Sequence, residues 1–180
     1  MTGYLTKADP SARGETVALK IPNTEISGIF QDTVAIHFRE KLDTAKQEAM
    51  MQALWAGDTK SASALMSDLL WKTISYMDYH EDYYHAFMAG LFVDRGYETK
   101  SNKERGLGRP DLQLFDVDNR RAMIIEVKKA DSKVNMDKSC DEALKQIVDN
   151  EYAKNLDAGF ETVYCYGIAF FQKSARIKKL

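Results

Sequence analysis

Apolar residues recur at helical spacing through the first half of the chain. A helix is therefore expected over about 24–42, a second over about 44–56, and a third from near Asp58. The third carries a single apolar stripe, formed by Ala62, Leu65, Met66, Leu69 and Leu70. Residues 3–7 and 15–21, which lie on either side of a polar turn, are expected to form short strands.

Shorter apolar runs in the second half predict strands that alternate with helices. The expected elements are a helix over about 80–94, a strand over 97–103, two strands joined by a hairpin around 112–115 and 122–128, a helix over about 139–156, and strands over about 161–170 and 174–178. The run Ile124–Val127 is too apolar for an exposed edge, so we expect a strand buried on both faces. The order is thus a helix, a three-stranded meander, a helix and closing strands.

Two carboxylates and a lysine are expected to meet at the hairpin. Side chains alternate across a strand, so Glu126 and Lys128 point to one face. Asp111 lies at the start of the neighbouring strand, where Pro110 is tolerated. Burying these charges costs free energy unless they are paired or bind an ion. The two carboxylates and the backbone carbonyl of Val127 could hold Mg²⁺, which takes oxygen ligands. Lys128 could then orient a water or stabilise charge on a phosphate.

These residues also have simpler explanations. A Glu-x-Lys pair on a strand is commonly an ordinary salt bridge. His80 and His85 are five residues apart, about 140° around a helix, whereas a His-Glu-x-x-His zinc site needs a spacing of four. That spacing argues against a zinc protease. His85 lies one turn after Glu81 and could face the same cleft, although a core or surface histidine is the simpler interpretation.

Pro110-Asp111 followed by Glu126-Val127-Lys128 resembles the short motif of the PD-(D/E)XK nuclease superfamily. The resemblance covers roughly residues 24–180 and is supported by three flanking segments, at 80–91, 143–147 and 163–170. It implies a restriction-endonuclease-like α/β core, with a mixed central sheet flanked by helices and an N-terminal helical addition. It also implies that Glu81 completes the metal site, that Gln146 contacts it, and that Tyr152 is the family's aromatic residue or a packing residue.

The same succession of segments is similar to one bacterial family in which such a domain follows an AAA-ATPase-like domain. The expected division is then residues 1–23 as a remnant of the ATPase-like domain, 24–75 as the helical addition and 76–180 as the nuclease-like core. The chain contains no Gly-x-x-x-x-Gly-Lys-Ser/Thr phosphate loop. Any ATPase activity would therefore belong to an ATPase-like domain or partner, and the chain would be a fragment or a shortened gene product.

Charge is spread unevenly along the chain, whose formal net charge is −2. Residues 1–99 hold five more acidic than basic residues, whereas residues 100–133 hold three more basic than acidic ones. Arg109 and Lys129 lie in this basic stretch beside the predicted site and are candidate nucleic-acid contacts. Two cysteines make no disulfide framework, and no apolar run or signal pattern indicates a membrane, so the cytoplasm is expected.

The sequence therefore predicts a metal-dependent nuclease acting on nucleic acid, with DNA as the expected form and Mg²⁺ or Mn²⁺ as the cofactor. The expected catalytic residues are Asp111, Glu126, Lys128, Glu81 and Gln146. A second hypothesis stays open: a catalytically silent nucleic-acid-binding or regulatory module of an ATPase-like protein. Nuclease domains of this kind often dimerise to reach two strands, so a homodimer is conceivable, although no interface pattern is visible in the sequence.

Overall fold

A computed structural model of the chain describes residues 6–7, 19–20, 43–73, 81–92, 97–101, 109–154, 156 and 159–180. The helix expected over 24–42 lies outside these residues. Of the two strands expected near the N-terminus, the described parts are β1 (Thr6–Lys7) and β2 (Leu19–Lys20), which pair antiparallel. No helix within the described residues is long and apolar enough to cross a membrane.

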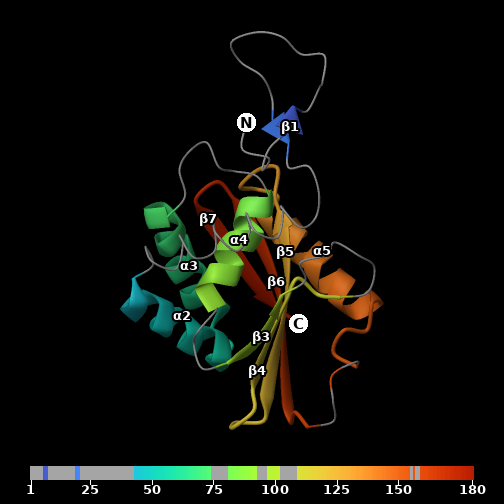
Figure 1. Cartoon of the computed structure of the whole chain (residues 1–180). Coiled ribbons are helices and arrows are strands. Elements are labelled where there is room, and N and C mark those ends of the chain that lie inside the picture. Colours follow the sequence, from blue (N-terminus) through green and yellow to red (C-terminus); the bar gives the residue numbers. More distant parts are fainter. Residues whose placement is uncertain are drawn as a thin grey trace.

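Five strands form a mixed sheet in the order in which they occur along the chain (Figure 1). They are β3 (Glu98–Ser101), β4 (Leu112–Asp116), β5 (Arg121–Lys129), β6 (Thr162–Phe171) and β7 (Ser174–Lys179). The β5–β6 pair is parallel and the other pairs are antiparallel. The hairpin, the meander and the closing strands were all predicted, and the arrangement confirms the expected restriction-endonuclease-like fold class.

Helices cover both faces of the sheet, with α5 on one side and α2, α3 and α4 on the other (Figure 1). Their bounds are Thr44–Ala56 for α2, Thr59–Thr73 for α3, Glu81–Phe92 for α4 and Met136–Asp149 for α5. Strand β5 is central. Its Ile125 and Val127 belong to the large core with α2, α3 and α4, whereas Ile124 packs in a smaller cluster with α5. This confirms that the strand is buried on both faces.

The boundary between α2 and α3 follows from local capping. Asp43 precedes α2, and its side chain accepts a hydrogen bond from the Lys46 N–H at 3.2 Å. Gly57 ends α2 in the left-handed region, at φ 75°, where glycine carries no Cβ penalty. Asp58 then accepts the Ser61 N–H at 3.0 Å at the start of α3. The observed bounds of α2 agree with the predicted span of about 44–56, and α3 begins near Asp58 as predicted.

Helix α5 differs from its predicted span of about 139–156. It begins three residues earlier, at Met136, after a turn in which Ser132 accepts the Asn135 N–H. It ends at Asp149, because Glu151 has a φ of 54° and the Tyr152 N–H bonds back to the Ile147 carbonyl. The predicted C-terminal extension to residue 156 was wrong: residues 150–156 suit a helix by composition, but the chain reverses so that Tyr152 can pack against Ile147 in the smaller core.

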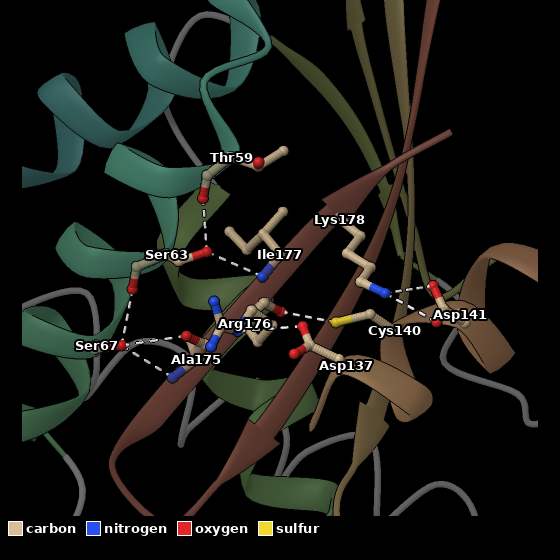
Figure 2. A network of polar contacts seen from close by, with 10 residues as sticks. All are labelled: Thr59, Ser63, Ser67, Asp137, Cys140, Asp141, Ala175, Arg176, Ile177 and Lys178. Carbon is tan, nitrogen blue, oxygen red and sulfur yellow. Dashed lines mark hydrogen bonds and ion pairs between the residues drawn. The ribbon is translucent and has the colours of Figure 1, made fainter. Parts of the chain in front are cut away.

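Strand β7 is an edge strand, and two serines of α3 occupy its outer edge (Figure 2). Ser67 Oγ accepts the Ala175 N–H at 2.9 Å, and Ser63 Oγ accepts the Ile177 N–H at 3.0 Å. Each hydroxyl also donates to a carbonyl one turn earlier on α3, that of Ser63 or Thr59. An open strand edge is a template for pairing with another chain. Helix α3 therefore closes the sheet at this edge.

We expect Ser63→Ala combined with Ser67→Ala to lower the free energy of unfolding by about 1 to 3 kcal/mol, because two part-buried N–H groups lose their partners. Urea denaturation measures the change. Ser61→Ala is the matched control, since Ser61 is exposed on the same helix and its hydrogen bonds run to Asp58. Equal stability of the double variant and the control would show that the serines do not hold the edge.

On the face of the sheet opposite α2, α3 and α4, helix α5 lies unusually close to β6 at Gly167. A methyl group there would fall inside van der Waals contact of the Cys140 carbonyl oxygen and 3.0 Å from Leu144 Cγ. Helix α5 also holds β7, through Lys178 to Asp141 at 2.7 Å and through the Cys140 thiol to the Arg176 carbonyl at 3.2 Å (Figure 2). Gly167 thus sets how near α5 comes to the sheet.

Gly167→Ala should destabilise the fold by about 1 to 3 kcal/mol, because the added methyl group meets backbone that cannot rotate away. Thermal or urea unfolding measures the loss. Gly159→Ala is the matched control, since nothing lies within 4 Å of a Cβ there. A Gly167→Ala protein as stable as this control would mean that α5 can shift without cost.

Candidate active site

The side chains of Asp111 and Glu126 each accept a hydrogen bond from a backbone N–H on the opposite side of the hairpin. Asp111 Oδ2 accepts the N–H of Val127 at 2.8 Å, and Glu126 Oε2 accepts the N–H of Asp111 at 3.3 Å. The two carboxylates are therefore brought together by reciprocal bonds between the start of β4 and the end of β5. This is the meeting that the hairpin spacing predicted.

The end of the β4–β5 ladder explains why Asp111 can reach Val127. The register ends at Leu112 opposite Ile125, yet β5 continues to Lys129. Extending the same register would place Pro110 opposite Val127, and a proline has no N–H to donate to the Val127 carbonyl. In a strand the N–H and C=O of one residue face the same neighbour. The Val127 carbonyl therefore faces the side on which Asp111 already takes its N–H.

Lys128 lies between Glu126 and α5. Its Nζ donates to Gln146 Oε1 at 2.5 Å and lies 3.5 Å from Glu126 Oε1. The Lys128 side chain is 31% exposed, whereas that of Glu126 is 3% exposed. Alternation along β5 puts both side chains on the α5 face, and the close packing at Gly167 brings Gln146 within reach. The lysine amine is thus held at the solvent side of a buried carboxylate.

Burial is the main reason that the pKa of Glu126 is raised to about 7, and the negative charge of Asp111 adds to it. Lys128 and the Asp111 N–H act in the opposite direction. Asp111 and Glu126 therefore repel each other where little water screens their charges, and Lys128 offsets part of this repulsion. A positive charge placed between them would remove this repulsion.

His85 on α4 also belongs to this site. Its Nδ1 lies 3.8 Å from Asp111 Oδ1, an ion-pair distance if the imidazole is protonated. Helix α4 is fixed next to it, because the Tyr84 ring stacks on Phe170 at 4.7 Å and its hydroxyl donates to the Gln172 carbonyl. Sequence reasoning favoured a core or surface histidine here. The available signal was its position one turn after Glu81 on the helix before the sheet.

The remaining predicted site residues are placed as follows. Glu81 is the first residue of α4, and its side chain lies outside the described part of the structure. Arg109 is exposed just before Pro110, and Lys129 is exposed at the end of β5. Tyr152 is buried beside Ile147 and accepts a hydrogen bond from Asn150, so it is a packing residue. Both cysteines are buried and free.

The oxygen atoms of this site supply part of the coordination shell that a hard divalent cation needs. Asp111 and Glu126 offer carboxylate oxygens, and the Val127 carbonyl faces the same side without a ladder donor opposite it. Among the described side chains, no three His, Cys, Asp or Glu residues gather as a metal-binding group. The two carboxylates, one backbone carbonyl and bound water are therefore the donors on which a metal would rely, together with whatever Glu81 contributes.

The raised pKa of Glu126 predicts how stability depends on pH. A group with a folded pKa of about 7 and an ordinary value of 4.5 binds its proton more tightly in the folded protein. The contribution of this protonation to the free energy of unfolding is complete below about pH 4.5 and is lost as the pH rises through about 7. Metal-free Glu126→Gln protein should therefore be more stable than the wild type at pH 8, by on the order of 1 to 3 kcal/mol.

Urea denaturation in the presence of a chelator, at several pH values between 5.5 and 8, measures this difference. The gap between the variant and the wild type should widen as the pH rises. A gap that stays constant with pH, or a variant that is less stable at pH 8, would mean that Glu126 is not held in a repulsive environment.

Comparison with known proteins agrees with this geometry. Residues 79–180 match the sequence profile of the PD-(D/E)XK nuclease superfamily, and the matched stretch contains Asp111, Glu126, Lys128 and all five strands of the mixed sheet. No curated protein and no solved structure gave a match. Because the matched residues make up more than half of the chain, the protein belongs to the PD-(D/E)XK nuclease superfamily.

Proposed function

We propose that the protein is a metal-dependent nuclease that hydrolyses phosphodiester bonds, with DNA as the expected substrate. The observation that carries this proposal is the reciprocal bonding of Asp111 and Glu126, which holds two carboxylates together beside Lys128. Members of the superfamily are generally nucleases that use divalent metals such as Mg²⁺. A fold can host inactive relatives, so the geometry of the site, not the fold, supports the activity.

In this proposal Asp111, Glu126 and the Val127 carbonyl hold Mg²⁺ or Mn²⁺, and Glu81 is a further candidate ligand. When bound, such a metal lowers the pKa of a coordinated water and neutralises charge that develops on the phosphate. Lys128 supplies a fixed positive charge for the attacked phosphate, and Gln146 keeps its amine in place. His85 keeps Asp111 turned toward the site. Arg109 and Lys129 are proposed contacts to the substrate backbone.

Several finer expectations belong to the same proposal. A link to an AAA-ATPase-like domain or partner, a bacterial origin, a cytoplasmic location and a homodimer that reaches two strands all remain predictions from the sequence. The division of the chain at residues 23 and 75 also remains a prediction. The contacts of α3 with β7 favour treating α2 and α3 as part of the body that carries the site.

One observation supports the alternative of a silent binding or regulatory module. Lys128 already has an amide partner in Gln146 and a carboxylate partner in Glu126, so the lysine is satisfied without substrate. A site retained as a salt bridge would look similar. The two functions differ in whether a metal binds and whether phosphodiester bonds are cut.

A cleavage screen separates them. Linear duplex, single-stranded and branched DNA, together with RNA, are incubated with the protein and Mg²⁺ or Mn²⁺, and the products are resolved on gels. We expect cleavage of at least one form, loss of cleavage by at least 100-fold in Lys128→Ala, and no cleavage with a chelator. Lys145→Ala is the matched control, because Lys145 is an exposed lysine on α5 outside the site.

Metal binding is measured on the same proteins by thermal unfolding. Mg²⁺ or Mn²⁺ should raise the melting temperature of the wild type, because a ligand that binds only the folded state stabilises it. Glu126→Ala should lose this shift. A metal shift without cleavage of any form would favour the binding module, and no metal effect together with no cleavage would contradict the nuclease proposal.

A further inference from the structure

The segment that follows the site residues carries two lysines that stand apart from the other surface lysines nearby. Lys129 ends β5, and Lys133 lies in the loop between β5 and α5; both are exposed. Neither forms an ion pair or a side-chain hydrogen bond with any residue that the structure describes. By contrast, Lys138, Lys145, Lys154 and Lys178 each pair with a carboxylate. Asp131, which is exposed between Lys129 and Lys133, likewise forms no ion pair with a described residue, so residues 129–135 carry one net positive charge next to Lys128.

The same loop also presents an apolar side chain to solvent. Val134 is 89% exposed, more than any other large hydrophobic residue in the described part of the chain. It directly follows Lys133 and precedes the turn residue Asn135. A polar residue would suit such a turn better. The combination of an exposed valine with unpaired lysines is suited to a polyanion that also offers apolar surface.

Both ends of the loop are firmly anchored. The Ala130 N–H donates to the Phe170 carbonyl at 2.8 Å, and Ala130 is buried with Met136 in a small core under α5. Within the loop, the Asn135 N–H bonds to Ser132 through both its carbonyl and its hydroxyl. Little backbone conformational entropy would therefore be lost when a ligand binds the loop.

We propose that Lys129, Lys133 and Val134 form a substrate-binding loop for a nucleic-acid strand that is unpaired beside the cleaved phosphate. This inference rests on the proposed nuclease function and names its substrate class. The lysines bind backbone phosphates that neighbour the one at Lys128, and Lys129 approaches from the opposite face of β5, because consecutive strand residues alternate. Val134 contacts the face of a base. Because base faces are covered in a duplex, this contact favours single-stranded or frayed substrates.

The lysines and the valine have different experimental signatures. Phosphate contacts release counterions, so each contact contributes about 0.7 to the slope of log affinity against log salt for a single strand. An apolar contact contributes affinity that does not depend on salt. Binding is measured by fluorescence anisotropy in the Lys128→Ala background with Mg²⁺, so that it can be followed without cleavage, on short single-stranded and duplex DNA.

Lys129→Ala combined with Lys133→Ala should lower the salt slope by about 1.4 for single-stranded DNA. Val134→Ser should weaken single-strand binding about fivefold, weaken duplex binding less, and leave the slope unchanged. Lys145→Ala combined with Lys154→Ala removes the same charge away from the loop and should leave the slope as it was. All variants should keep the melting temperature of the parent.

An unchanged slope in the loop lysine variant, or an equal fall in the control, would overturn the proposed phosphate contacts. An unchanged single-strand affinity in Val134→Ser, or an equal loss for duplex, would overturn the preference for an unpaired strand. Either result leaves the nuclease proposal standing if the wild-type protein still cuts nucleic acid. Absence of any binding by the parent overturns the loop proposal, and the cleavage screen then judges the nuclease proposal separately.

Discussion

The early end of the β4–β5 ladder is the constraint on which the candidate site depends. β4 pairs with β5 only from Leu112, while β5 continues to Lys129, and Pro110 cannot supply the next N–H of the ladder. The Asp111 side chain fills this ladder position by accepting the Val127 N–H, and the Glu126 side chain accepts the Asp111 N–H. Had the ladder continued, its own hydrogen bonds would occupy the backbone groups of Val127, and the Asp111 side chain would not take the Val127 N–H.

The rest of the fold holds Asp111 and Glu126 in this arrangement from both faces of the sheet. On one face α5 packs closely on β6 at Gly167, which lets Gln146 reach Lys128. On the other, α4 is pinned by the stacking of Tyr84 on Phe170 and brings His85 beside Asp111. Helix α3 closes the outer edge of β7 with its serines, so the sheet that carries the site is not left open there.

Sequence reasoning succeeded where a local rule decides the structure. Alternation along β5 placed Glu126 and Lys128 on one face, and apolar residues at helical spacing predicted α2 over about 44–56. It did not succeed where distant contacts decide. The reversal at Glu151 depends on Tyr152 finding a core, and the approach of His85 to Asp111 depends on how α4 docks. The edge bonds of Ser63 and Ser67 join residues more than a hundred positions apart, so no local pattern could have indicated them.

The central claim is that Asp111 and Glu126 together form one metal site. Isothermal titration with Mn²⁺, repeated in buffers of different ionisation enthalpy, counts the protons released on binding. With the pKa of Glu126 raised to about 7, binding should release about one proton at pH 6 and almost none at pH 8.5, and Glu126→Gln should abolish the proton released from this carboxyl. Binding that releases no proton at pH 6, or that is as tight in Glu126→Gln as in the wild type, would contradict the claim.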